Sequence, residues 1–529
     1  MNGKQKLAAV FLAALVLAAA GCVKGGSNAP AGGLKIINVG TTNDAPTLSP
    51  LASNNTMTDE LSRLIFLPLV GIDENLDFVY RLAESVTTDD NVNFTIRLRK
   101  NIAWTDGTPS TADDVIFSLN ALTNPVVNSY NPSVYNIIEG TDEAGFFPAE
   151  TGRLAGALKA DDYTLTVKTK FPVTKTIFLI QVANAVRSLP AHLLSGIPAE
   201  KLKTDEFWQK LPVSNGPFLF KEQVPSQYLS FEANPGYFLG RPKIDALNFK
   251  ILSGAHITAQ LESGEIDMNF PGVGHVPNDD YDRVQGFAHV RTEFGPSKSM
   301  QILFYNVNVI DNVAVRQAMD LAIDREGILR DVLKGSAYIS KTPVTNLIQY
   351  WNEDAARYAY DPEKARQLLA ESGWDLSKRL VFYVPTGNVT RERICILIAE
   401  SFKAVGLNVA VEKMDFPTSL ARVQGRDFDI GIVGVPEQPY NAIQSLKNLI
   451  SWTNFAPPRW ERLAEIISSS VDEEELRRSY LELQQILADN VPVSGLYSEY
   501  GLSAVNTRVT HGILKERGAL LDVEQWDVR

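Results

Sequence analysis

The residue types that carry most enzymatic chemistry are sparse in this chain and fall at no catalytic spacing. The 529 residues include five histidines and two cysteines. No Gly-x-Ser-x-Gly elbow, Gly-Lys-Ser/Thr phosphate loop or His-Glu-x-x-His zinc helix occurs. His256, His275 and His289 lie in one region, but at no spacing that metal ligands use. These features favour a binding protein over an enzyme. We expect no catalytic residue, no cofactor and no metal site.

Cys22 has the clearest chemical context of the two cysteines. Lys4 and Lys6 precede an apolar run over 7–20, and this order is the pattern of an export signal. The run is shorter than a membrane-spanning helix usually requires. The run ends Ala19-Ala20-Gly21-Cys22, which resembles a lipobox, where the cysteine receives a lipid and begins the mature chain. An ordinary secretory signal that happens to end beside a cysteine is the alternative. We expect lipidation of Cys22.

The chain beyond the signal is expected outside the cytoplasm and attached to the cell membrane. It lies in the periplasm if the cell has an outer membrane, and otherwise on the outer face. Only one cysteine remains, so no internal disulfide is available. Cys395 falls in a helical pattern of apolar residues and is expected to be a buried, unreactive side chain.

Length and charge limit the remaining possibilities. A chain of 529 residues is too long for one core, so two or three domains are expected. Its hydrophobic content of 45% is ordinary for a globular protein. The formal net charge of -12 argues against a nucleic-acid partner, which requires concentrated positive charge. An acidic surface that aids solubility is the simpler interpretation.

The stretch 81–125 shows how the elements are spaced. Alternation of Phe94, Ile96 and Leu98 with polar residues predicts a half-buried strand. A turn follows, and Thr111 with Asp114 three residues later predicts a capped helix. Similar signals predict helices that begin at Asp361, Asp472 and Asp324, a helix that ends at Gly264, and strands at 163–168, 407–411 and 428–435.

The amino-acid sequence of this stretch resembles that of family 5 of the solute-binding proteins of ABC importers. RLAESV, then FTIRLRKNIAWTDGTPSTADDVIFSL, follows the family signature, with Val86 where tryptophan is usual. Later segments resemble it in the same order, and together they cover roughly residues 35–510. These segments are SNGPF at 214–218, FEANPGY at 231–237, RPKID at 241–245, LESGEID at 261–267 and YDPEKA at 360–365.

The resemblance implies an α/β fold of the type II periplasmic-binding-protein kind. Two lobes with mixed sheets are joined by a hinge of two crossovers, which we place near 298–305 and 491–497, and large members carry an extra inserted domain. The expected organisation is a signal peptide over 1–21, a lipidated flexible tether over 22–34, lobe I over 35–71, 206–298 and 497–529, the inserted domain over 72–205, and lobe III over 299–496.

The resemblance also implies where a ligand lies. In peptide-binding members an extended peptide pairs with a segment of each lobe, and an aspartate in the larger lobe binds its free amine. The matching segment here is 434–440, where the aspartate position falls on Gln438, or on Glu437 after a shift of one residue. If Gln438 is the true match, a ligand without a free amine is favoured. The expected groove residues are Asn54, Asn55, Thr56, Tyr305, Glu437, Gln438, Tyr440 and Trp452. Trp452 and Trp460 could stack on a ligand or lie in the core.

The expected function is capture of a small polar solute, most readily a dipeptide or oligopeptide, and delivery to a membrane permease. The permease and ATPase are other chains, the lipid on Cys22 provides the membrane contact, and a monomer suits a clamp that opens and closes. Two alternatives stay open. The same fold could bind an oligosaccharide or a metal chelate, or the protein could be a sensor that reports its ligand to a receptor.

Overall fold

The computed structural model describes most of the chain that follows the signal and tether. The described residues are 33–52, 55–270, 272–295, 299–340, 342, 344, 348, 350–355, 359–436, 442–512 and 519–529. Among these residues, no helix combines the length and apolar character that a membrane span requires.

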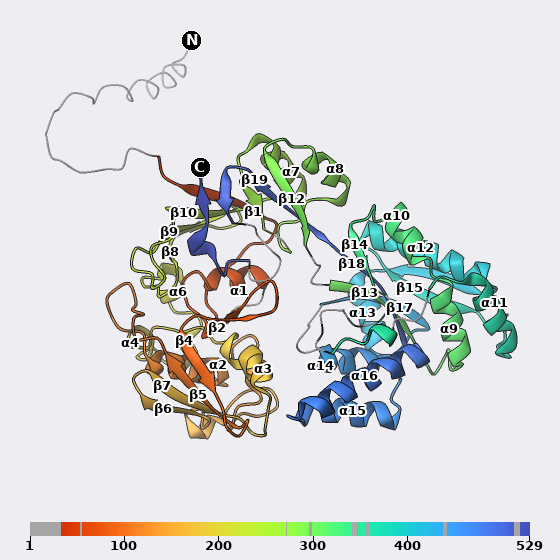
Figure 1. The fold of residues 1–529 in the computed structure, drawn as a ribbon, viewed down its shortest axis with the longest axis horizontal. Coiled ribbons are helices and arrows are strands. Elements are labelled where there is room, and N and C mark those ends of the chain that lie inside the picture. Colours follow the sequence, from red (N-terminus) through yellow and green to blue (C-terminus); the bar gives the residue numbers. More distant parts are fainter. Residues whose placement is uncertain are drawn as a thin grey trace, which may run out of the picture. The chain divides into compact units, whose positions relative to one another are not determined.

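A seven-stranded mixed sheet forms one lobe (Figure 1). Its order is β12-β19-β11-β1-β10-β9-β8, so strands from both ends of the chain belong to one sheet, with β11 between β19 and β1. β1 pairs in parallel with β10 and β11, whereas β19 runs antiparallel to β11 and β12. The strands are β1 (Ile36–Thr41), β8 (Phe218–Val224), β9 (Tyr228–Ala233), β10 (Ala246–Ile251), β11 (Met268–Asn269), β12 (Val290–Gly295) and β19 (Gly501–Asn506). The helices α1 (Thr56–Ser62), α7 (Gly254–Ser263) and α8 (Tyr281–Gln285) belong to the same part of the chain.

A four-stranded antiparallel sheet occupies the region predicted as an inserted domain. Its order is β4-β5-β7-β6, and α2 packs against it. Its side chains are continuous with the core of the seven-stranded lobe, because one cluster of buried residues includes both Phe94 and Phe249. The two parts are therefore not separated by solvent at their junction. The elements are β4 (Ala83–Thr87), β5 (Asn93–Leu98), α2 (Ala112–Thr123), β6 (Ala157–Asp161) and β7 (Thr164–Lys168).

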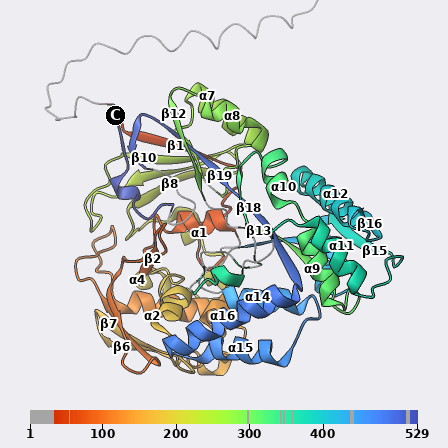
Figure 2. The same cartoon turned by 45° about the vertical axis from the view of Figure 1, so that its right-hand side comes forward.

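A six-stranded mixed sheet of order β14-β18-β13-β17-β15-β16 forms the other lobe. Two separate apolar clusters pack against it, one with side chains of α9 to α12 and the other with side chains of α14 to α16. Figure 2 shows these two groups of helices in different places around the sheet. The strands are β13 (Ser299–Tyr305), β14 (Ala337–Ile339), β15 (Leu380–Pro385), β16 (Val409–Met414), β17 (Ile430–Pro436) and β18 (Val493–Glu499). The helices are α9 (Val313–Leu321), α10 (Arg325–Asp331), α11 (Pro362–Glu371), α12 (Val389–Ala404), α13 (Phe416–Gln424), α14 (Ala442–Ser451), α15 (Pro458–Ser469) and α16 (Glu473–Asn490).

The chain passes between the two large sheets twice. The first crossing joins β12 to β13, and the second joins β18 to β19 through Tyr500 alone. The second crossing lies beyond the predicted range 491–497, because residues 497–499 still pair with β13 and β14. The expected pair of crossovers and the mixed sheets are otherwise as the fold class predicts.

The predicted helix ends are confirmed where side-chain chemistry defines them. Thr111 and Asp114 form a reciprocal capping box at the start of α2. Asp361 and Asp472 accept hydrogen bonds from backbone amides in the first turns of α11 and α16. Gly264 ends α7 at a φ of 74°, a left-handed conformation that glycine adopts without strain.

Candidate functional site

The carboxyl ends of the parallel strands lie at the end of each sheet where the chain crosses to the other sheet. In the seven-stranded sheet, β1, β10, β11 and β12 all point toward the crossing that follows Gly295. In the six-stranded sheet, β15, β16, β17 and β18 point toward the crossing at Tyr500. Ligands of open α/β sheets bind outside these carboxyl ends. We therefore take these edges as the candidate site.

The segment predicted to bind the ligand's amine leaves the sheet at this edge. Pro436 ends β17 and pairs with Ser299, the first residue of β13 after the crossing. Glu437, Gln438 and Tyr440 follow at once and lie outside the described residues. The described chain resumes with α14.

On the seven-stranded lobe, the predicted segment leads into α1. Asn54 lies outside the described residues. Asn55 is the N-cap of α1, and its side-chain oxygen accepts a hydrogen bond from the Thr58 amide at 2.8 Å. Thr56 is exposed at the start of the helix. The Asn55 side chain therefore fixes the helix start, and Thr56 is the accessible polar side chain of the two.

Two ion pairs of Asp59, one of them to a buried arginine, hold α1 in place. Asp59 bonds Arg187 at 2.7 Å and Arg63 at 3.2 Å. Arg187 is only 2% exposed, and burial together with the positive charge of Arg63 lowers the Arg187 pKa to about 10. Because a buried guanidinium needs a fixed counter-charge, these contacts set the position of α1 and of the loop before it.

The structure places Tyr305 and the two tryptophans in or against the core of the six-stranded lobe. Tyr305 is fully buried, and its hydroxyl lies 3.1 Å from the Ser494 hydroxyl. Trp460 is 2% exposed, and Trp452 is half-buried with its ring centroid 5.7 Å from that of Phe304. Tyr305 and Trp452 belong to the two different apolar clusters of this sheet. They are thus not brought together, and neither adjoins Asn55 in any described contact.

Four polar side chains that the sequence did not single out lie near the carboxyl end of β18. Gln301 on β13 pairs with Tyr497 on β18, and Glu499 lies two residues beyond Tyr497 on the same face. Arg391 in the first turn of α12 is 7% exposed, and Cys395 one turn later packs in the same apolar cluster as Tyr497. A signal was present, because Arg391 lies at helical spacing before Ile394, Cys395 and Ile398 and so continues their apolar stripe with a charged residue.

Burial controls the ionisation of this group. It raises the pKa of Glu499 above its ordinary value, while the charge of Arg391 opposes the shift. It also raises the pKa of the Tyr497 hydroxyl, and the negative charge of Glu499 adds to that effect. Cys395 is fully buried with its thiol pKa raised to about 12, which confirms the expected unreactive side chain.

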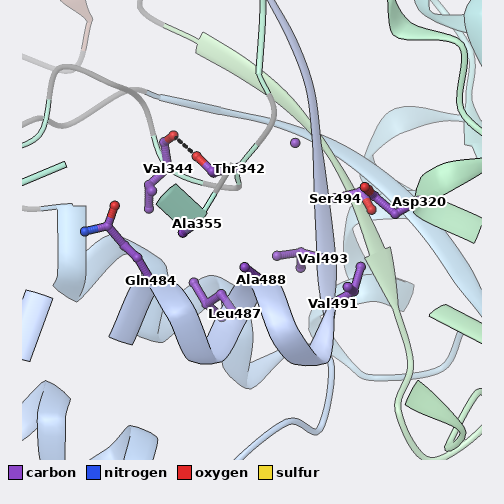
Figure 3. A pocket seen from close by; sticks show the side chains of 11 residues that line it. Asp320, Thr342, Val344, Ala355, Gln484, Leu487, Ala488, Val491, Val493 and Ser494 are labelled. Carbon is purple, nitrogen blue, oxygen red and sulfur yellow. Dashed lines mark hydrogen bonds between the residues drawn. The ribbon is translucent and has the colours of Figure 1, made fainter. Parts of the chain in front are cut away.

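A small internal cavity elsewhere in the lobe is too small for a solute. Its volume is about 20 Å³, which is room for roughly one water molecule. Figure 3 shows its wall, in which apolar side chains of α16, of β18 and of the segment 344–355 lie beside four polar ones, namely Asp320, Thr342, Gln484 and Ser494. It lies near the first residues of β18, at the opposite end from Glu499. No group of three metal-ligating side chains occurs in the part of the chain that the structure describes.

Comparison with known proteins agrees with this architecture. Residues 77–457 match the family described as bacterial extracellular solute-binding proteins, family 5. The oligopeptide-binding protein AppA of Bacillus subtilis is 26% identical over 92% of this chain and 90% of its own length. Heme-binding protein A of Haemophilus influenzae is 26% identical over 75% of this chain and 73% of its own length.

Solved structures show the same fold. The substrate-binding protein CtaP of an ABC transporter from Listeria monocytogenes superposes with a TM-score of 0.80 at 22% identity, over 93% of this chain and 99% of that one. AppA of Bacillus subtilis, solved with a nonapeptide, superposes with a TM-score of 0.69 at 24% identity, over 93% and 99%. The expected two-lobed α/β fold is thereby confirmed.

Proposed function

Because this chain belongs to family 5 of the bacterial extracellular solute-binding proteins, which serve ABC transporters and are not enzymes, we propose that the solute it captures is an oligopeptide. The supporting observation is its similarity to an oligopeptide-binding protein over 92% of the chain. A heme-binding protein is also similar to this chain, so a direct measurement of the ligand distinguishes a peptide from another solute.

The proposed mechanism uses strand pairing and closure. A peptide lies extended at the carboxyl ends of the two sheets and bonds through its backbone to the segment after β17 and to the loop before α1. The segment 53–56 and the segment 437–440 supply these contacts. Because a solute that touches both lobes binds the closed form more tightly, it shifts the protein toward closure. The permease then accepts the closed form, and its ATPase supplies the energy.

Native mass spectrometry of the protein purified without denaturant tests the ligand class. A series of adducts that fragments into amino acids would support the peptide proposal. Adducts spaced by a sugar unit, or adducts with a metal isotope pattern, would contradict it while leaving the transport role in place. If no adduct survives purification, calorimetric titration with peptides of two to nine residues gives the same decision.

Replacing Glu437 with alanine is expected to weaken binding of a peptide with a free amino terminus by about tenfold or more, since a buried ammonium loses its partner. Isothermal titration measures this affinity. An amino-terminally acetylated peptide is the control, because its affinity should not change. If Gln438→Ala weakens binding and Glu437→Ala does not, then Gln438 is the contact and the amine is not the recognised group.

We also propose that Cys22 carries the lipid anchor. In cells that express the full chain, Cys22→Ser is expected to move the protein from the membrane fraction to the soluble extracytoplasmic fraction, because lipid is its means of attachment. Fractionation followed by immunoblotting measures this change, and Cys395→Ser is the matched control that should stay with the membrane. An unlipidated wild-type protein, shown by mass spectrometry, would favour an ordinary secretory signal.

A further inference from the structure

The second crossing between the two large sheets is held from both sides through the backbone of one residue. Tyr500 lies between β18 and β19, and its amide donates a hydrogen bond to the Ser336 carbonyl at 2.9 Å. Ser336 immediately precedes β14, so this bond ties Tyr500 to the six-stranded lobe. The Tyr500 carbonyl accepts a hydrogen bond at 3.2 Å from the hydroxyl of Tyr281, the first residue of α8 in the seven-stranded lobe. The two backbone groups of Tyr500 are therefore bonded to different lobes.

Both partners of Tyr500 are themselves firmly placed. Ser336 is 4% exposed, and its hydroxyl donates a hydrogen bond to the Leu333 carbonyl. The Tyr281 ring packs against an apolar cluster that includes Leu502 of β19, and α8 lies against β12 and β19 (Figure 1). A movement of either lobe is therefore transmitted to Tyr500 through a fixed partner.

A third aromatic ring links this contact to the other crossing. The centroid of the Phe294 ring lies 5.5 Å from that of Tyr281 and 6.4 Å from that of Tyr500, and both pairs are tilted. Phe294 is the next-to-last residue of β12, the strand that leads into the first crossing, and it pairs with Leu502 of β19. Tilted and offset ring pairs at such distances are favourable. The three rings therefore hold the two crossings together on one side.

A rotation of one lobe against the other acts on the backbone torsions of Tyr500, because its neighbours on both sides are paired in β18 and β19. The amide of Tyr500 moves with the six-stranded lobe, whereas its carbonyl is bonded to the seven-stranded lobe. Rotation turns this carbonyl away from the Tyr281 hydroxyl, and a hydrogen bond weakens steeply once its angle falls below about 120°. The bond to Tyr281 thus favours one range of lobe orientations over the others.

We propose that Tyr281, Phe294 and Tyr500 form a bracket on the hinge that restrains the relative orientation of the two lobes. We name these three residues the hinge bracket. The inference concerns the movement of the lobes and holds for any solute, so it does not rest on the peptide proposal. A solute that requires another orientation has to break the bracket, and the apparent affinity for that solute falls by the corresponding factor.

Distances between the lobes test the hinge bracket. Spin labels are attached at Ser263→Cys on α7 and Ala404→Cys on α12, which are exposed positions in different lobes, and double electron–electron resonance gives their distance distribution. The full chain carries Cys22→Ser, and Cys395 is fully buried and stays unlabelled. Tyr281→Phe removes only the hydroxyl. The population outside the main wild-type distance is expected to rise by roughly three- to tenfold, which is the effect of losing one ordinary hydrogen bond.

Tyr228→Phe is the matched control. It is the same substitution in the same lobe, and it also removes a hydroxyl hydrogen bond, which joins Tyr228 to Glu222 at 3.0 Å. Tyr228 lies on β9, which β10, β1 and β11 separate from β19. The distance distribution of this control should equal that of the wild type. An unchanged distribution in Tyr281→Phe, or an equal change in Tyr228→Phe, would overturn the hinge bracket.

A thermal melt and a native mass spectrum of each sample establish that the variants are folded and carry the same amount of solute. If Tyr281→Phe does not fold, Phe294→Ala replaces it, because Phe294 is 37% exposed and a substitution there costs little stability. A broader distribution then supports the hinge bracket, and an unchanged one overturns it. The mass of the bound solute decides the peptide proposal separately, so either conclusion can fail without the other.

Discussion

Asp114→Ala is expected to cause one of the two largest losses of stability available by a single substitution in this chain. Asp114 is 4% exposed, and its carboxylate accepts hydrogen bonds from the Thr111 amide at 2.9 Å, the Ala191 amide at 2.9 Å and the Trp104 indole at 3.1 Å. Alanine leaves all three donors without an acceptor. Each buried hydrogen-bond donor that is left without an acceptor lowers the free energy of unfolding by about 1–3 kcal/mol. We therefore expect the free energy of unfolding to fall by on the order of 3 kcal/mol or more.

Urea unfolding followed by circular dichroism and tryptophan fluorescence measures this loss. Trp104 is one of the orphaned donors, so its emission should change even before unfolding. Asp113→Ala is the matched control, because the neighbouring Asp113 is exposed and bonds only the surface Lys159 in the described structure. Such surface pairs contribute at most about 1 kcal/mol. Equal losses for the two variants would contradict the assigned role of Asp114.

Asp267→Ala is expected to have a comparable effect on the seven-stranded lobe. Asp267 is 1% exposed, accepts from the Asn38 amide at 2.8 Å and receives both Nε and a terminal nitrogen of Arg508. These contacts tie β1, β11 and the segment after β19 to each other. Alanine leaves the buried Asn38 amide without its acceptor and removes the hydrogen bonds from Arg508, whose side chain is 40% exposed and stays partly solvated, so the expected loss is about 2–3 kcal/mol.

A substitution at Arg508 distinguishes the stability that is lost because its charge has no partner from the stability that is lost because side-chain packing is removed. A double variant in which Asp267 becomes Asn and Arg508 becomes Met removes both charges, and it should recover part of the stability lost in Asp267→Ala. Thermal and urea unfolding measure the recovery, with Asp282→Ala on the exposed face of α8 as the surface control. If Asp267→Ala unfolds at the same urea concentration as the wild type, the ion pair is not structurally important.

Local chemistry made several elements predictable. Thr111 with Asp114, Asp361 before a proline, and Asp472 before an acidic turn each satisfy helix amides from within a few residues, so neighbouring sequence suffices to locate them. Gly264 marks a helix end for the same local reason. The family resemblance supplied the two-lobed architecture, which periodicity alone cannot provide.

The rest depends on contacts between distant parts of the chain. The position of β19 between β11 and β12 joins residues more than 200 apart, and no local pattern encodes it. Arg391 drew no prediction, because it lies in α12 and the charged or polar groups that affect it, Tyr497 and Glu499, come from β18 much later in the chain. The choice between Glu437 and Gln438 depends on a one-residue shift in the sequence match, and no periodicity in that segment fixes the register.

The placement of β19 has a consequence for the order in which the protein can fold. The lobe that begins with β1 lacks an interior strand until residues 501–506 are available, and until then β11 and β12 have open edges. Lys35 also bonds Asp527, a partner 492 positions away. The first lobe to leave the ribosome is therefore the last to be completed. Pairings over such distances pay a large loop-closure entropy, so folding should be slow and the incomplete lobe prone to aggregation.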